Sequence, residues 1–234
     1  MNISLSYYTS IGKRKTNEDS MSAAETKNGL LAVVADGLGG HANGEFASRE
    51  AVRVMNRRLI EAEISEDGLE DAVLEADEAV RLLHEEKAPG ALTTVSALWL
   101  GERQAAAANV GDTRIYQFRA GRVRYQSIDH SAAQLAVLAG EISREEIRGH
   151  RDRNKLIRVL GAEEAPRVEQ KLLDVRPGDS FLLCSDGFWE IITEQQMLRA
   201  QQDAADAVVW LDRMRKLVEP QAKDNNTAVA ILVK

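Results

Sequence analysis

The sequence lacks several features that would place it in well-known classes of protein. It has one cysteine, Cys184, which cannot form an internal disulfide, so the disulfide-rich secreted domains are excluded. Basic residues are not in excess. The formal net charge of -7 argues against nucleic acid as a partner, because phosphate backbones attract Lys and Arg. No apolar run approaches the length that spans a membrane, so we expect no membrane contact.

Other absences bear on domain organisation and chemistry. No Pro-rich, Ser-rich or low-complexity stretch marks a linker, so we expect a single domain over residues 1–234. Residues 1–6 lack the basic and apolar regions of a signal peptide, which leads us to expect a cytoplasmic protein. Cys and His residues at zinc spacing, a P-loop and a G-x-S-x-G motif are also missing, which excludes the chemistries that depend on them.

The stretch 33–41, VVADGLGGH, is the first with a chemical signature. Residues 30–35 form a short apolar run typical of a buried strand, which leads into Asp36 and Gly37. Glycine lets the backbone approach a ligand closely. A carboxylate beside a glycine carbonyl therefore offers two adjacent oxygen ligands of the kind that Mg²⁺ and Mn²⁺ prefer. The alternative is a turn in which Asp36 only caps backbone amides.

The same arrangement recurs further along the chain. Asp112 follows an apolar run within NVGDTR, Asp186 follows another within CSDG, and Asp224 opens the stretch DNNT before a third. Carboxylates gathered in one place repel each other unless cations lie among them, so a cluster of these acids predicts divalent metal ions. Two such ions about 3.5–4 Å apart can activate a water for in-line attack on a phosphoryl group.

The loop 12–19, GKRKTNED, combines basic and acidic residues. We select Arg14 as the residue that binds an anion, because its planar guanidinium can hold two oxygens of a phosphate at once. Glu18 and Asp19 are adjacent, so on a strand their side chains would point to opposite faces. One could then ligate a metal while the other orients a bound water. The alternative is a solvated surface loop.

The remaining pattern predicts helices and antiparallel strands. Apolar residues at helical spacing predict helices over 44–61 and 69–86. A capping box at Thr193 predicts another, and a longer helix is expected over 203–219. Short apolar runs between turns predict strands that pair as consecutive hairpins: 3–8, 30–35, 93–100, 104–110, 115–118, 123–125, 168–175, 181–184 and 228–233.

Residues 129 to about 161 interrupt this pattern with short helical pieces and polar residues. The stretch is too irregular for a core, so we expect an insertion that covers one end of the domain, as loops near active sites often do. The basic run 148–158 within it is interpreted as a solvated face, with a docking patch as the alternative.

Six motifs occur in the order seen in metal-dependent protein phosphatases of the 2C type, and the chain resembles that family over nearly its whole length. Each motif is unspecific alone, but six in order at compatible spacings are specific. They are RKTNED (14–19), VADGLGGH (34–41), TT (93–94), NVGDTR (109–114), CSDG (184–187) and DNNT (224–227).

This resemblance implies an α+β fold in which two antiparallel β-sheets are sandwiched between helical layers (αββα), with residues 129–161 as a helical flap that influences substrate access. It implies a bacterial catalytic domain that stands alone and hydrolyses phosphoserine and phosphothreonine in proteins by metal-activated water. The implied partners are phosphorylated proteins and a serine/threonine kinase that the enzyme opposes in signalling. We expect a monomer.

The resemblance also implies the metal ligands. Asp36 would bridge two Mn²⁺ or Mg²⁺ ions, and the Gly37 carbonyl would join one of them. Asp186 and Asp224 would hold the other ion. Asp112 resembles the acid that, with Asp186, holds a weaker third ion in bacterial relatives.

Three residues near the N-terminus complete the implied site. Arg14 would bind the substrate phosphate, while Glu18 and Asp19 would bind or orient the metal waters. One departure concerns the leaving group: animal relatives have a histidine directly after the Asp-Gly pair, whereas this chain has Leu38 there and its nearest histidine at His41. We expect a water acidified by its cation to donate the proton instead.

Two other functions compete with a phosphatase. A metal-dependent phosphotransferase would need a nucleophilic side chain, and none is evident in the sequence. A non-catalytic module that binds phosphoproteins on the same fold would be expected to have lost metal ligands, and none of the matched acids is missing.

Overall fold

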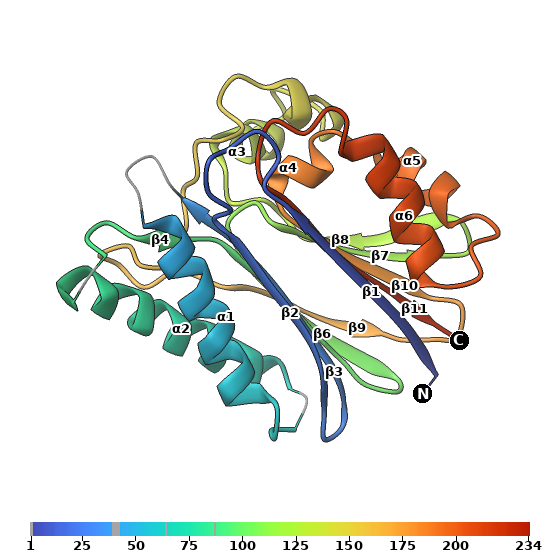
Figure 1. Ribbon diagram of the computed structural model, residues 1–234, viewed down its shortest axis with the longest axis horizontal. Helices are drawn as coiled ribbons and strands as arrows, with labels where there is room; N and C mark the ends of the chain where they lie inside the picture. The colour runs from blue at the N-terminus through green and yellow to red at the C-terminus, as the bar shows by residue number, and fades with distance from the viewer. Residues whose placement is uncertain (1, 39–42, 64, 87) are drawn as a thin grey trace.

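The structure, a computed structural model, describes residues 2–38, 43–63, 65–86 and 88–234. Two β-sheets lie face to face, and all strand pairs in them are antiparallel (Figure 1). One sheet has the order β1 (Ile3–Ser10), β11 (Asn226–Val233), β10 (Ser180–Cys184), β7 (Arg114–Arg119) and β8 (Arg122–Gln126). The other has the order β2 (Asp19–Thr26), β3 (Gly29–Leu38), β5 (Val95–Leu100), β6 (Gln104–Val110) and β9 (Glu169–Asp174), with β4 (Leu92–Thr93) paired to β3.

Helices cover the outer faces of both sheets, which confirms the predicted αββα layering (Figure 1). The helices α1 (Gly44–Leu59) and α2 (Glu66–Glu86) pack on the sheet that contains β3. The other sheet is covered by α4 (Asp186–Trp189), α5 (Glu194–Gln201) and α6 (Ala207–Val218). Two short helices, α3 (Ala132–Leu138) and η1 (Glu145–Gly149), lie in the predicted insertion. No helix among the described residues combines the length and apolar character needed to cross a membrane.

The central strands bury both of their faces. On β3, Leu31 and Val33 belong to the core shared with α1 and α2, whereas Ala32 and Val34 belong to the core between the sheets. Successive side chains of a strand point to opposite faces, so a strand in an inner layer must be apolar at every position. This explains the uninterrupted apolar run before Asp36.

The strand order corrects the expectation that the sheets consist of consecutive hairpins. The hairpins β5–β6 and β7–β8 form as predicted. However, β1 and β11 come from opposite ends of the chain and are neighbours, with Ile3 opposite Val233. β11 pairs in turn with β10, which pairs with β7. Long-range pairing of this kind is selected by burial of the sheet faces, which a local sequence pattern does not report.

One strand and one helix boundary also differ from the sequence prediction. The sequence pattern does not predict β2, because its residues are small or polar and only Met21 and Ala23 pack against the core between the sheets. The last helix begins at Ala207 instead of Asp203. Its N-cap is Asp206, whose side chain accepts a hydrogen bond from the backbone N–H of Val209 (2.9 Å).

The segment 129–161, which we call the flap segment, contacts the region of α4 and α5. Arg148 donates to the Glu194 carboxylate (2.9 Å), and Arg153 donates to that of Glu190 (2.5 Å). Both arginines are only partly exposed. The interpretation of 148–158 as a solvated face is therefore wrong at these two positions, because each guanidinium has a carboxylate partner across the interface.

Candidate active site

The acids predicted from the sequence gather at one end of the sandwich. Asp19 begins β2 and lies directly opposite Asp36 near the end of β3. Asp112 lies in the turn between β6 and β7. Asp186 begins α4 directly after β10, and Asp224 lies just before β11, the neighbour of β10. Strands from both sheets therefore deliver carboxylates to the same place.

Two glycines allow the acid-bearing segments to approach each other closely. A Cβ atom on Gly37 would lie 2.3 Å from the carbonyl oxygen of Gly44 and 2.7 Å from that of Glu18. A Cβ atom on Gly187 would lie 2.0 Å from the Asn225 carbonyl oxygen. No side chain fits at either position without moving backbone. The glycine beside Asp36 and the one beside Asp186 are thus required by close packing around the acids.

Asp19 is held by hydrogen bonding on one side and has a free oxygen on the other. The Ser185 hydroxyl donates to its Oδ2 atom (2.8 Å). Its Oδ1 atom is buried and accepts no hydrogen bond from the described residues. A buried polar atom without a partner is unfavourable, so this oxygen points to a ligand or a water that would satisfy it.

The clustered carboxyl groups raise one another's pKa values. Burial is the main cause at each, and it raises the pKa of Asp19 to about 6 and that of Asp186 to about 7. The pKa of Asp36 is raised well above its usual range by burial and then by the charges of Asp19, Asp186 and Asp112. The Asp36 and Asp186 carboxyl groups each influence the pKa of the other, so the two groups are close neighbours. Divalent cations would remove the repulsion that produces these shifts.

The donor set fits a hard cation. All the candidate ligands are carboxylate or carbonyl oxygens, which suit Mg²⁺ and Mn²⁺. Across the described ranges, no three Asp, Glu, His or Cys side chains are arranged so that they could hold a metal ion by themselves. This agrees with the habit of Mg²⁺, which takes one or two carboxylates and keeps several waters. An ion bound here would therefore need the Gly37 carbonyl oxygen or waters as further ligands.

Arg14 lies at the edge of the acid cluster, as its predicted role requires. Its Nη2 atom donates to Asp224 Oδ2 (2.5 Å), and this bond raises the pKa of Arg14. The two side chains are 54% and 38% exposed, so this ion pair adds little to stability. A guanidinium has five N–H donors in a fixed fork, which leaves others for a phosphate in solvent.

Glu18 is also beside the cluster. Burial raises its pKa, and the nearby charge of Glu45 in the first turn of α1 raises it further. The Glu18 backbone N–H donates to Asn225 Oδ1 (2.8 Å), and Asn225 Nδ2 donates to the carbonyl oxygens of Ile11 (2.9 Å) and Thr16 (3.0 Å). Asn225 thus fastens the Arg14 loop to the entry of β11.

Sequence reasoning misses the side chains that support the acids. Ser185 and Asn225 each follow or precede a predicted ligand, so adjacency to an acid is the signal that would have found them. Glu45 carries no such signal, because its approach to Glu18 depends on how α1 packs. The predicted turn at Gly39, Gly40 and His41 lies outside the described residues. Leu38 ends β3, opposite Leu92 of β4.

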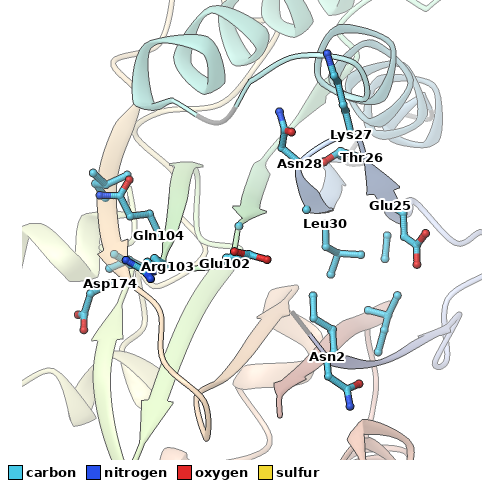
Figure 2. Close-up of a pocket in the computed structure, with 17 residues that line it drawn as sticks. Asn2, Glu25, Thr26, Lys27, Asn28, Leu30, Glu102, Arg103, Gln104 and Asp174 are labelled. Atoms are coloured by element: carbon cyan, nitrogen blue, oxygen red, sulfur yellow. The ribbon is translucent and has the colours of Figure 1, made fainter.

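A cavity of about 1320 Å³ lies elsewhere on the sandwich (Figure 2). It is lined by the β2–β3 hairpin, the β5–β6 turn and the end of β9. Glu25 in its lining is six residues from Asp19 on β2, which corresponds to roughly 20 Å along a strand. The lining mixes apolar side chains such as Leu30 with single charges of both signs, such as Glu25 and Lys27. We therefore place the chemistry at the acid cluster.

Comparisons with known proteins identify the family of the chain. A family model described as "Protein phosphatase 2C" matches residues 8–230. The serine/threonine phosphatase stp of Listeria monocytogenes is 34% identical over 193 residues, covering 79% of this chain and 77% of the relative. The crystal structure of the Mycobacterium tuberculosis serine/threonine phosphatase PstP/Ppp superimposes with a TM-score of 0.89 at 28% identity, covering 99% of both chains.

A further solved structure contains metal. The catalytic domain of PstP in complex with two manganese ions is 27% identical to this chain, with a TM-score of 0.86 and full coverage of both chains. The resemblance, the fold class and the enzymatic activity expected from the sequence are confirmed by these matches. The chain belongs to the protein phosphatase 2C family, the metal-dependent enzymes that dephosphorylate serine and threonine residues of proteins.

Proposed function

We propose that the acid cluster holds two Mn²⁺ or Mg²⁺ ions and that protein phosphoserine and phosphothreonine are hydrolysed there. The single observation that carries this proposal is the convergence of Asp19, Asp36 and Asp186, with raised pKa values and an unpartnered buried oxygen. The two manganese ions of the PstP complex support the same stoichiometry.

The proposed ligands are those that the sequence motifs indicate. After burial, the charges of Asp19, Asp186 and Asp112 raise the pKa of Asp36, which supports Asp36 as the acid that would bridge two ions, with the carbonyl of the next residue, Gly37, as a further ligand. Asp186 and Asp224 would hold one of the two ions. When bound, the ions would activate a water for attack on phosphorus and neutralise charge on the phosphoryl group.

The chain's own residues would orient the reactants. Asp19 presents its unpartnered Oδ1 atom to a water, because Ser185 already occupies its other oxygen. Glu18 is half-buried next to it and would accept from a second water. Arg14 would bind the phosphate with the N–H groups that it does not use for Asp224, which fixes the phosphorus for in-line attack.

Asp112 would, with Asp186, hold a weaker third ion. Its side chain is buried, and the charge of Asp186 is the largest electrostatic contribution that raises its pKa. The Asp112 carboxylate therefore lies near Asp186. An ion held by these two carboxylates would bind more weakly than the ions of the main cluster.

The setting of the enzyme follows from its substrates. Phosphoserine and phosphothreonine in proteins are made by protein kinases, so we infer an opposing serine/threonine kinase. We also propose that residues 1–234 act as one catalytic domain in the cytoplasm, as a monomer, with the flap segment over the substrate path. Light scattering of the purified chain would measure its oligomeric state.

The proposal is tested with purified protein and two substrates. We expect hydrolysis of p-nitrophenyl phosphate and of a phosphothreonine peptide when Mn²⁺ or Mg²⁺ is added, and loss of both activities in excess EDTA. A phosphotyrosine peptide serves as the specificity control. Activity that survives complete metal removal would contradict the metal assignment.

A further inference from the structure

Trp189 makes a direct hydrogen bond to the residue that bears the Asp112 carboxylate. Its indole Nε1–H donates to the Asp112 backbone carbonyl oxygen (2.9 Å), and both groups are buried. Trp189 ends α4, the helix that begins with Asp186. The two acids proposed for the third ion are therefore connected through four residues of helix and one buried hydrogen bond.

The indole ring is itself fixed by a buried arginine. The guanidinium carbon of Arg114 lies 3.4 Å from the centre of the Trp189 ring. Arg114 also makes two hydrogen bonds to the Asp129 carboxylate (2.8 and 2.6 Å). A guanidinium stacked on an aromatic face and paired in this bidentate way has one orientation, so it holds the ring in place.

Arg114 has an electrostatic effect on the same acid. Burial is the main cause that raises the pKa of Asp112, and the charges of Asp186 and Asp129 raise it further, whereas the charge of Arg114 lowers it. Arg114 is ion-paired with Asp129 while it stacks on Trp189. Arg114 and Trp189 contact each other, and both act on Asp112: Arg114 through its charge and Trp189 through its hydrogen bond to the Asp112 carbonyl.

The turn is held on its other side by the base of the flap segment. The His130 backbone N–H donates to the Gly111 carbonyl oxygen (2.8 Å), and the Gly111 N–H donates to His130 Nδ1 (3.2 Å). These bonds fix Gly111. Among the described residues, the Trp189 indole is the one group that donates a hydrogen bond to the Asp112 carbonyl oxygen. Loss of that donor would leave a buried carbonyl unpaired and free the next peptide unit to rotate.

We propose that Trp189 is a positioning residue for Asp112: its indole N–H sets the direction of the Asp112 carboxylate and thereby the affinity of the weak metal site. This inference rests on the proposed function, because it takes Asp112 to be a ligand of the third ion. It goes beyond that assignment in naming what orients the ligand. The competing explanation is that Trp189 only fills the core.

The test is Trp189→Phe in the full chain, which keeps an aromatic ring for Arg114 but removes the N–H. We expect the Mn²⁺ concentration for half-maximal turnover of a phosphothreonine peptide to rise about tenfold, equivalent to ~1.4 kcal/mol. Calorimetry should show unchanged affinity for the tightly bound ions. Electron paramagnetic resonance of free Mn²⁺ should show directly that the weak site is lost at concentrations that fill it in the wild type.

A matched control is available in Trp210→Phe. Trp210 is also fully buried, and its Nε1–H likewise donates to a backbone carbonyl, that of Met197 (3.0 Å). Trp210 lies on α6 and packs against Phe118 in the core, away from the acids. The Trp210→Phe variant should therefore have a lower melting temperature but the wild-type dependence of turnover on Mn²⁺ concentration. If both variants lower stability and neither changes the Mn²⁺ dependence, Trp189 is only a core residue and the inference is overturned.

A measurement on the wild type keeps the question decidable if Trp189→Phe does not fold. The chain has three tryptophans, so ¹⁵N-labelled protein should give three indole N–H signals, with Trp189 assigned by elimination in Trp99→Phe and Trp210→Phe. Diamagnetic Mg²⁺ added over the weak range should shift the Trp189 signal, and Asp112→Ala should abolish the shift. A Trp189 signal that does not move contradicts the inference.

Asp112→Ala separates this inference from the proposed function. If the variant keeps the wild-type dependence on weakly bound Mn²⁺, the assignment of Asp112 as a ligand fails, and the positioning role fails with it. If Asp112→Ala removes that dependence but Trp189→Phe leaves it unchanged, the ligand assignment stands and only the role of Trp189 is refuted.

Discussion

The two ends of the β-sandwich differ: one end has a cavity, and the other end has the cluster of acidic residues. One end has a cavity of about 1320 Å³, lined by polar and apolar side chains. The other end gathers Asp19, Asp36 and Asp186, whose pKa values are raised by burial and mutual repulsion. Protein interiors tolerate such crowding only where a ligand or a function compensates for it. Unfavourable charge, more than volume, therefore identifies the active end.

The largest effect should come from removing one charge at the active end. Asp36→Asn keeps the shape of the side chain but removes the charge of the proposed bridging ligand, so we expect turnover of a phosphothreonine peptide to fall by more than ~100-fold. Asp224→Asn should behave similarly. The control at the opposite end is Glu25→Gln, on the same strand as Asp19, which should keep wild-type activity. A comparable loss in Glu25→Gln would break the contrast between the ends.

The pH dependence of stability should differ between metal-free and metal-loaded protein. The folded pKa values of Asp19 (about 6) and Asp186 (about 7) exceed the usual value near 4, so the folded state binds more protons than the unfolded state. The contribution of these two groups to the free energy of unfolding is therefore present at low pH and is lost as the pH rises from about 4 through 7. In EDTA we expect the melting temperature to fall by roughly 5 °C or more between pH 5.5 and 8.

Adding Mn²⁺ at pH 8 should reverse this fall, because the ions replace the protons. Calorimetry in buffers of different ionisation enthalpy should show proton release when Mn²⁺ binds at pH 6. A melting temperature that stays constant or rises with pH in EDTA would show that these acids are not crowded in the metal-free chain.

A smaller effect is expected at Arg14, on the exposed edge of the cluster. Arg14→Lys keeps the charge but removes the bidentate fork, so KM for a phosphothreonine peptide should rise about 3- to 10-fold with a smaller change in kcat. Arg103→Lys, in the lining of the distant cavity, is the matched control and should leave KM unchanged. An unchanged KM in Arg14→Lys would remove Arg14 from the phosphate site.

The smallest effect is expected at His41. A positioned general acid is typically worth ~10²–10⁴-fold, so if His41 is not the leaving-group acid, His41→Ala should reduce kcat on the peptide less than ~10-fold. Nitrophenolate needs little help to leave. A large loss on the peptide with little loss on p-nitrophenyl phosphate would therefore identify His41 as the acid.

The parts of the structure that the sequence predicts are those with local signals. The apolar run 30–35 followed by Asp36 predicts both the strand and the carboxylate at its end. The capping box of Thr193 and Gln196 begins α5 as expected. The strand β2 escapes prediction because its small and polar residues lack a clear alternation. Its place beside β3 depends on long-range packing, which a local window does not contain.

The candidate site divides in the same way. Four of the acids are found because each stands beside glycine or asparagine at a strand end, namely Asp36, Asp112, Asp186 and Asp224, and the family resemblance supplies their grouping. The hydrogen bond from Ser185 to Asp19 spans 166 positions of sequence, and that from the Glu18 amide to Asn225 spans 207. The bond from Trp189 to the Asp112 carbonyl spans 77. Such partners are set by topology, so residue type alone does not reveal them.

The most direct test of the account is a calorimetric titration of metal-free protein with Mn²⁺, comparing the wild type with Asp36→Asn and Glu25→Gln. We predict two tightly bound ions per chain in the wild type and in Glu25→Gln, and loss of tight binding in Asp36→Asn with its circular dichroism spectrum preserved. Equal affinity in all three proteins would contradict the assignment of the acid cluster as the metal centre.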